Sequence, residues 1–177
     1  TFNCPGYIVI AGTRYNCHQL SGHGAQSFIN IFENSCNPAF IEIGQRLGSN
    51  LFYNYFKAFG FTQKTGIDLP GETTGVYYTA DNMGPVELAS ESFGQTFRIT
   101  PMQMISAVSA VANGGYYVKP HIVKEILDSN GNVTQSFSTE KLRQVVSEET
   151  SQIISTCLSS VVENGSGKNA YVAGYRM

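Results

Sequence analysis

Apolar residues along most of the chain recur at intervals of three and four, which is typical of amphipathic helices. The first such pattern begins near Gly24, places Phe28, Ile29 and Phe32 on one face, and ends near Asn34. Further helical patterns occupy residues 37–48, 49–60, 86–93, 100–115 and 147–163. The sequence therefore predicts a mainly helical body.

Several predicted helices begin with recognisable capping residues. Asn37 is a suitable N-cap and Pro38 a suitable first helical residue, because the N–H that proline lacks would be unpaired there anyway. Thr100 and Gln103 form a capping-box pattern around Pro101. The residues expected to face the core are Phe40, Ile43, Leu47, Leu51, Phe52, Tyr55, Phe56, Phe59, Met104, Ile105, Val108 and Val111. In the last helix Ile153, Cys157 and Val161 share one stripe, beside Ile154, Leu158 and Val162.

Strand patterns occupy less of the chain. Residues 7–10 alternate before a turn at 11–13, which predicts a small hairpin within an excursion of residues 1–23. Residues 116–127 and 133–137 alternate on either side of Asn130-Gly131, a strong hairpin signal. We expect a long loop at 61–84 and an extended segment at 171–177. The pattern predicts an α+β chain with parts at 1–23, 24–115, 116–146 and 147–177.

Composition and charge narrow the classes of function. Hydrophobic residues make up 42% of the 177-residue chain, which is enough for a packed core. A net charge of −2 without a basic run argues against nucleic-acid binding. No apolar stretch approaches the roughly 20 residues of a membrane span. The chain opens and closes within patterned segments, so we expect both ends to be cut from a longer protein.

One short motif at a helix junction suggests chemistry. Ser35-Cys36-Asn37 lies between the first two predicted helices. On its own the S-x-N pattern is weak, because most serine and asparagine residues at helix starts are simply caps. The segments around it change that interpretation.

These segments resemble the transpeptidase domain of penicillin-binding proteins, particularly the monofunctional class B type that acts in elongation, division or sporulation. The matching segments, in the family's order, are residues 22–24, 35–40, 59–61, 66–72, 94–95, 99–103, 112–115, 118–120, 161–162 and 165–168. Because the resemblance covers nearly the whole chain, it implies that residues 1–177 form part of one such domain.

The resemblance implies a serine acyl-transfer site with three motifs: S-x-x-K with the nucleophile, S-x-N, and K-T-G. A lysine whose pKa is lowered by burial and neighbouring cations would take the serine proton. By position, Ser35 would relay the proton to the leaving amine. Asn37 would hold the lysine and the substrate amide.

The other two motifs have no functional counterpart in the chain. Lys64-Thr65-Gly66 spells K-T-G but follows Ser35 too soon. Ser138-Thr139-Glu140-Lys141 spells S-x-x-K but follows a polar hairpin, where a lysine would stay solvated and protonated. The chain by itself is therefore expected to be inactive.

The resemblance also implies the setting of the complete protein. We expect the mainly helical portion of the serine D,D-transpeptidase and β-lactamase-like fold, with a small hairpin and little of the central sheet. The parent would cross-link peptidoglycan stem peptides, bind β-lactams, need no cofactor for catalysis, and work with cell-wall machinery at the extracytoplasmic face of the membrane, anchored by an N-terminal segment. The alternatives are a β-lactam sensor module and a catalytically dead scaffold.

The cysteines suggest a second site. Cys4, Cys17 and Cys36 lie with His23 in the first 36 residues, whereas Cys157 lies far away on a helix. Three thiolates and one imidazole make a closed tetrahedral set for a structural Zn²⁺. A Cys4–Cys17 disulfide across the hairpin, with Cys36 merely buried, is the alternative, as are free thiols. Some elongation-type members of the resembled family bear zinc beside S-x-N, so a metal here would fix the excursion onto the active-site loop.

Overall fold

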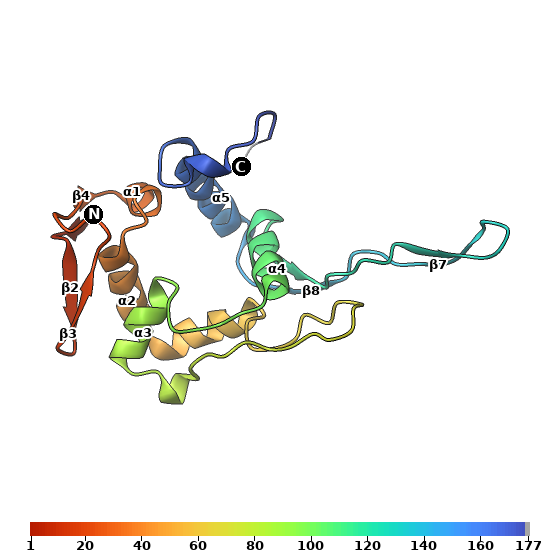
Figure 1. Cartoon of the computed structure of the whole chain (residues 1–177), viewed down its shortest axis with the longest axis horizontal. Coiled ribbons are helices and arrows are strands. Elements are labelled where there is room, and N and C mark those ends of the chain that lie inside the picture. The colour runs from red at the N-terminus through yellow and green to blue at the C-terminus, as the bar shows by residue number, and fades with distance from the viewer. Residues whose placement is uncertain (176–177) are drawn as a thin grey trace. The chain divides into compact units, whose positions relative to one another are not determined.

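The structure is a computed structural model that describes residues 1–175, and it combines helices with short strands (Figure 1). The helices are α1 (Phe28–Glu33), α2 (Asn37–Ala58), α3 (Pro85–Ser92), α4 (Pro101–Ala112) and α5 (Glu148–Glu163), with 3-10 turns η1 (Ala80–Asn82) and η2 (Lys168–Ala170). The strands are β1 (Phe2–Cys4), β2 (Tyr7–Ile10), β3 (Thr13–Asn16), β4 (Gly24–Gln26), β5 (Tyr116–Val118), β6 (Glu125–Leu127), β7 (Val133–Ser136) and β8 (Lys141–Gln144).

All strands within residues 1–175 belong to two-stranded antiparallel sheets. β2 and β3 form the predicted N-terminal hairpin, whose turn residues Ala11 and Gly12 both have positive φ. This is the backbone that a two-residue hairpin turn requires. β1 pairs with β4, so that Cys4 lies opposite Gly24. Helical structure therefore starts later than Gly24, contrary to the prediction.

Helix α1 starts with a capping box formed by Ser27 and Asn30. The Ser27 side chain accepts a hydrogen bond from the Asn30 backbone N–H, and the Asn30 side chain accepts from the Ser27 backbone N–H. This capping box satisfies N–H groups that an α-helix leaves unpaired at its start. Residues 24–26 are consequently free to pair as a strand.

The long second helix is interrupted where the sequence predicts a boundary. Gly48 has φ 76° and ψ 159°, so α2 consists of two helical stretches joined by a break. A positive φ is accessible to glycine at little cost, whereas a side chain would be strained there. The helix predicted at 100–115 ends at Ala112, and the Ser147 hydroxyl accepts from the Thr150 N–H at the start of α5, where the helix at 147–163 was predicted.

The chain divides into two compact units. Unit 1 comprises Thr1–Asn54, Tyr77–Phe97 and the residues from Gln152 onward, and unit 2 comprises Tyr55–Val76 and Arg98–Ser151. Each unit is discontinuous in sequence, because α2 and α5 each supply residues to both. Unit 1 holds both candidate sites.

The core of unit 1 surrounds the cysteines. Its buried cluster consists of Cys4, Cys17, Ile31, Cys36 and Ala39, against which Phe2, Phe32 and Ile43 pack. Three sulfur-bearing side chains therefore take the place that branched aliphatic residues fill in most cores. The aliphatic contribution to this core is small.

In unit 2 a buried glutamine side chain connects α4 to the turn that follows Phe59. Gln103 on α4 is fully buried, and its amide nitrogen donates to the carbonyls of Phe61 and Gln63 at 3.1 and 2.8 Å. Its amide oxygen accepts from the Thr100 backbone N–H at 2.8 Å, completing the predicted capping box. Gln103 thus caps one helix and fixes the turn that follows Phe59.

The predicted apolar face of α4 was wrong. Met104, Ile105 and Val108 are 46%, 59% and 50% exposed, whereas Gln103, Ser106, Ala107 and Ala110 are buried. These buried residues form the covered face of α4, which contacts β5 in unit 2. A periodic pattern identifies an apolar stripe but does not show which side of the helix is covered.

The predicted strand at 116–127 is divided. β5 pairs with β8, and the β6–β7 hairpin continues beyond them along the same ribbon (Figure 1). Pro120 lies in the gap, where it cannot donate to a sheet. The extended segment predicted at 171–177 forms no strand through residue 175, and residues 176–177 lie outside the described part. No helix within residues 1–175 has both the length and the apolar character needed to cross a membrane.

Candidate functional site

Ser35 lies at the turn that ends α1, in a left-handed backbone conformation with φ 47°. The Cys36 N–H donates to the Ile31 carbonyl and the Ser35 N–H donates to the Phe32 carbonyl, both at 3.0 Å. These two bonds form a Schellman motif, in which the left-handed position is usually a glycine. A serine at this position therefore carries backbone strain of about 1 kcal/mol.

The two residues assigned to the S-x-N motif differ in their surroundings. The Ser35 side chain is exposed and makes no hydrogen bond with any of residues 1–175. The Asn37 amide nitrogen donates to the Asn16 carbonyl at 3.1 Å, which links the start of α2 to the end of β3. The Ser35 hydroxyl therefore has no hydrogen-bond partner within residues 1–175, whereas the Asn37 amide, two residues later, is held by the Asn16 carbonyl.

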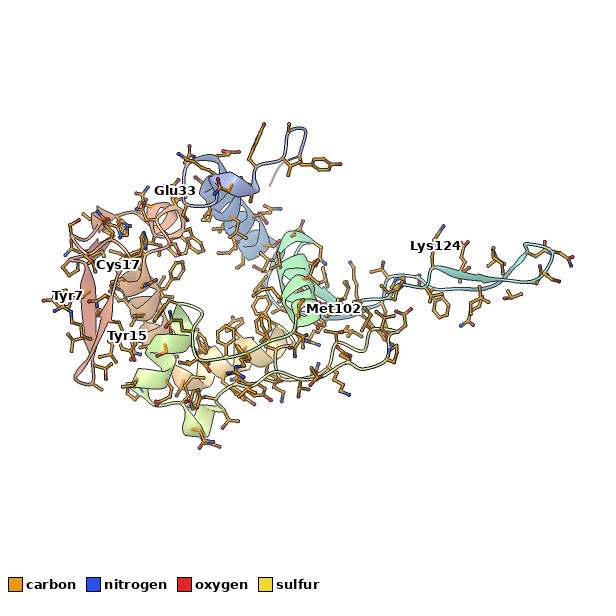
Figure 2. All side chains as sticks on the ribbon, in the orientation of Figure 1. Tyr7, Tyr15, Cys17, Glu33, Met102 and Lys124 are labelled. Atoms are coloured by element: carbon orange, nitrogen blue, oxygen red, sulfur yellow. The ribbon has the colours of Figure 1, made fainter. Side chains whose placement is uncertain are left out.

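The four residues expected to bind a metal come together in unit 1. The Sγ atoms of Cys4, Cys17 and Cys36 and a ring nitrogen of His23 all lie within 4.8 Å of one another. Cys4 ends β1, Cys17 follows β3, His23 precedes β4, and Cys36 lies between α1 and α2. Figure 2 labels Cys17 beside these strands. The excursion and the S-x-N turn therefore meet at this cluster.

One distance within the cluster matches that expected around a tetrahedral ion. Cys17 Sγ lies 3.5 Å from His23 Nδ1. In a tetrahedral Zn²⁺ site with Zn–S of about 2.3 Å and Zn–N of about 2.0 Å, sulfur and nitrogen ligands lie about 3.5 Å apart. All four cysteines of the chain are free, so the structure contains no Cys4–Cys17 disulfide.

Hydrogen-bond donors favour the thiolate of Cys4, whereas at Cys36 the effect of burial outweighs them. Backbone N–H groups of His23 and Gly6 donate to Cys4, and the Gln26 amide nitrogen donates to Cys36 Sγ at 3.3 Å. Burial alone raises the pKa of Cys4, but these hydrogen bonds lower it overall. Burial raises the pKa of Cys36 to about 11. A bound cation would stabilise both thiolates, as metal binding generally does.

His23 is suited to the neutral form that binds metals. Burial and the neighbouring His18 both lower its pKa, in that order. His18 lies close to the cluster but on its exposed side, with its Nδ1 3.9 Å from Cys17 Sγ. Cys157 is buried on α5 and belongs to no group of metal-binding residues among residues 1–175. The cluster is therefore the four-residue set that the sequence indicates.

Lys64-Thr65-Gly66, the segment that spells K-T-G, takes part in hydrogen bonds within the long loop. Glu72 accepts hydrogen bonds from the backbone N–H and the hydroxyl of Thr65 and from the Gly66 N–H, at 2.5, 2.6 and 3.0 Å. Burial raises the pKa of Glu72, but these bonds lower it overall. Asp68 in the same loop accepts from the N–H groups of Ile122 and Val123. These acids fasten the long loop within unit 2.

Sequence reasoning missed the residues that support the site. Gln26 is buried beside Cys36, and its amide oxygen accepts from Asn34 Nδ2 at 2.8 Å. Glu33 lies next to the motif and contacts α5. A polar residue within the apolar face of the first predicted helix was the available signal for Gln26. No local signal pointed to the partner of Glu33.

Comparison with known proteins identifies the family. A family model described as the penicillin-binding protein transpeptidase domain matches residues 1–177. Stage V sporulation protein D of Bacillus subtilis (strain 168) is 46% identical over 177 residues, covering 99% of this chain and 27% of that relative. Penicillin-binding protein PbpB of Mycobacterium tuberculosis is 31% identical over 182 residues, covering 98% of this chain and 26% of that relative.

Solved structures agree with the sequence comparisons. The crystal structure of penicillin-binding protein 3 of Mycobacterium tuberculosis in complex with ampicillin matches with a TM-score of 0.87 and 30% identity, over 98% of this chain and 40% of that chain. The expected portion of the α+β transpeptidase fold is confirmed by this match. The chain spans only 27% and 26% of the two curated relatives. Because the family model matches residues 1–177, this chain belongs to the penicillin-binding protein transpeptidase domain family.

Proposed function

We propose that this chain forms part of a peptidoglycan D,D-transpeptidase that cross-links stem peptides through a serine acyl-enzyme and is trapped by β-lactams. The observation that supports this most directly is Ser35, which keeps a strained backbone and an unbonded hydroxyl within the S-x-N motif. Strained residues of this kind tend to cluster at active sites. The relatives that match nearly the whole chain include a D,D-transpeptidase of Acinetobacter baumannii, at 25% identity.

The proposed reaction assigns Ser35 a proton-transfer role. The nucleophilic serine of an S-x-x-K motif, which residues 1–177 do not supply, attacks the carbonyl carbon of a D-Ala-D-Ala donor. As the new ester bond forms, the peptide C–N bond breaks. Ser35 relays the proton of the nucleophile to the departing nitrogen, and Asn37 orients the lysine and the substrate amide. An acceptor amine from a second stem peptide then attacks the ester carbonyl carbon, and the ester C–O bond breaks as the amine proton passes back to the serine oxygen.

A structural Zn²⁺ is the second part of the proposal. Cys4, Cys17, His23 and Cys36 would hold the ion, which would supply only a fixed cross-link and no catalytic step. Because Cys36 lies between Ser35 and Asn37, this cross-link would hold the N-terminal excursion against the S-x-N turn. Catalysis itself needs no cofactor in this scheme.

The setting of the complete protein follows from the same proposal. We place it at the extracytoplasmic face of the bacterial membrane, held there by an N-terminal membrane anchor of the complete protein. Its partners there would be stem peptides, β-lactams and the cell-wall synthesis machinery. The structure of a Mycobacterium tuberculosis relative with ampicillin supports the β-lactam assignment.

Covalent labelling of the complete domain tests the proposal. The wild-type domain should be labelled by fluorescent penicillin, and Ser35→Ala should lower the acylation rate by about 10²-fold, the scale for losing a proton-transfer group. Ser159→Ala, which removes a hydroxyl from α5, serves as the matched control and should acylate normally. A Ser35→Ala variant that acylates as fast as the control would remove Ser35 from the mechanism.

A further inference from the structure

The segment that follows α5 lies directly against the last residue of α1 (Figure 2). The Ser166 N–H donates to the Glu33 carbonyl at 2.9 Å. Gly165 approaches so closely that a Cβ at this position would lie 2.6 Å from the Glu33 Cα and carbonyl oxygen. Atoms this close leave no room for any side chain at 165. The backbone after α5 is therefore fitted to Glu33.

The Glu33 side chain makes a second connection to the same helix. Its Oε1 accepts from the hydroxyl of Ser160 on α5 at 2.5 Å, and its Oε2 accepts from Asn30 Nδ2 at 2.9 Å. Ser160 is only 8% exposed and also accepts from Asn164 Nδ2 at 3.1 Å. Hydrogen bonds to ionised groups are among the stronger ones in proteins. The bond from Ser160, followed by that from Asn30, lowers the pKa of Glu33, which favours the ionised form.

Glu33 is connected to the S-x-N motif by the turn at the C-terminal end of α1. It is the last residue of α1, and the next turn places Ser35 by the two Schellman bonds to Ile31 and Phe32. The Ser35 hydroxyl has no hydrogen bond of its own within residues 1–175. Its position therefore depends on the backbone that carries it. That backbone is held on one side by Cys36 in the cysteine cluster and on the other by Glu33.

We propose that Glu33 is a positioning residue for acyl transfer, which holds the turn bearing Ser35 in place by fastening the end of α1 to α5. The role rests on the proposed function of Ser35. It requires no contact between Glu33 and the substrate. Displacing a reacting group by about 1 Å can cost up to about 10²-fold in rate, so loss of the connection should affect the chemical step.

The test separates binding from acylation in the complete transpeptidase domain. Stopped-flow labelling with fluorescent penicillin gives the dissociation constant of the first complex and the acylation rate constant. The final extent of labelling gives the fraction of the protein that is folded. Glu33→Ala should lower the acylation rate constant about tenfold, while changing the dissociation constant less than about twofold. Glu33→Gln, which can still accept from Ser160, should recover part of the loss.

Two further variants keep the result interpretable. Ser160→Ala removes one bond of the connection without altering α1, and it should reproduce part of the Glu33→Ala defect even if Glu33→Ala does not fold. Glu163→Ala, which removes an exposed carboxylate from the same helix, should acylate like the wild type. The positioning role would be overturned if Glu33→Ala and Ser160→Ala both acylate at the wild-type rate. If Glu33→Ala does not fold, a wild-type rate constant in Ser160→Ala would overturn it. Absence of labelling in the wild-type domain would instead contradict the proposed function.

Discussion

Position 35 shows how a single residue can carry a functional constraint. A glycine there would relieve the left-handed strain and satisfy the usual preference of the Schellman motif, but it would remove the hydroxyl. Serine is therefore the less stable choice for the turn, but the proposed mechanism requires its hydroxyl for proton transfer. The cysteine cluster and the Glu33 connection, on either side of it, hold the turn despite this cost.

Glu91 is a residue whose burial has a measurable consequence. It is 2% exposed, its Oε1 accepts from the Tyr78 N–H at 3.3 Å, and its Oε2 has no partner among residues 1–175. Burial raises the pKa of Glu91, and the Tyr78 bond offsets this only in part. The folded state therefore holds the proton more tightly than the unfolded state, in which the pKa is about 4.3.

The sign of the pH dependence follows from this difference. Stability from Glu91 is fully present below about pH 4 and is lost as the pH rises through the folded-state pKa. Glu91→Gln, which stays neutral, should match the wild-type melting temperature near pH 4 and exceed it near pH 8. Thermal melting of the complete domain at both pH values measures this. Glu163→Gln is the exposed control, and an equal response of the two variants would contradict the prediction.

At the scale of elements, the Gln103 side chain joins α4 to the turn after Phe59. Gln103→Leu keeps the volume but leaves the carbonyls of Phe61 and Gln63 and the Thr100 N–H without this partner. Leaving buried polar groups unpaired costs about 1–3 kcal/mol each, with partial relief by relaxation. We expect the free energy of unfolding to fall by about 3 kcal/mol.

Urea unfolding of the complete domain checks this expectation. Gln152→Leu provides the matched control, because Gln152 is an exposed glutamine on α5. That substitution should change the free energy of unfolding by less than about 0.5 kcal/mol. Equal losses in the two variants would show that the hydrogen bonds of the Gln103 side chain do not stabilise unit 2.

The elements differ in how far the sequence could predict them. The β2–β3 hairpin, the break at Gly48 and the Thr100 capping box are local, and each depends on a few adjacent residues. The start of α1 was misplaced because apolar periodicity outweighed the Ser27 cap. The apolar stripe of α4 was assigned to the wrong side, because the side that is covered depends on packing with distant residues.

The candidate site shows the same division. Cys4, Cys17, His23 and Cys36 could be grouped from residue type and proximity in sequence, and the structure brings their ligand atoms within 4.8 Å. The bond between Glu33 and Ser160 joins residues 127 positions apart. Neither residue type nor spacing indicates such a pair, because surface glutamates and helical serines are common. A supporting contact of this kind becomes visible only in three dimensions.

At the scale of the whole molecule, the cysteine cluster is the structural centre of unit 1. The hydrophobic cluster around it contains three cysteines but only Ile31 as a branched aliphatic side chain. This cluster supplies little hydrophobic stabilisation of its own, because sulfhydryl groups bury less apolar surface than isoleucine or leucine. A structural Zn²⁺ at the cluster would compensate, since binding to a site that exists only in the folded state adds to folding stability.

Metal content and thermal stability should therefore change together. Complete domain purified without chelator should contain about one Zn²⁺ per chain, and removal by a strong chelator should lower the melting temperature by about 10 °C or more. Adding Zn²⁺ back should restore it. Cys17→Ser should lose the metal, whereas Cys157→Ser, which alters a buried cysteine outside the cluster, should keep it. Metal-free protein with a Cys4–Cys17 disulfide found by peptide mass spectrometry would refute the zinc assignment, because a sulfur in a disulfide cannot also serve as a thiolate ligand.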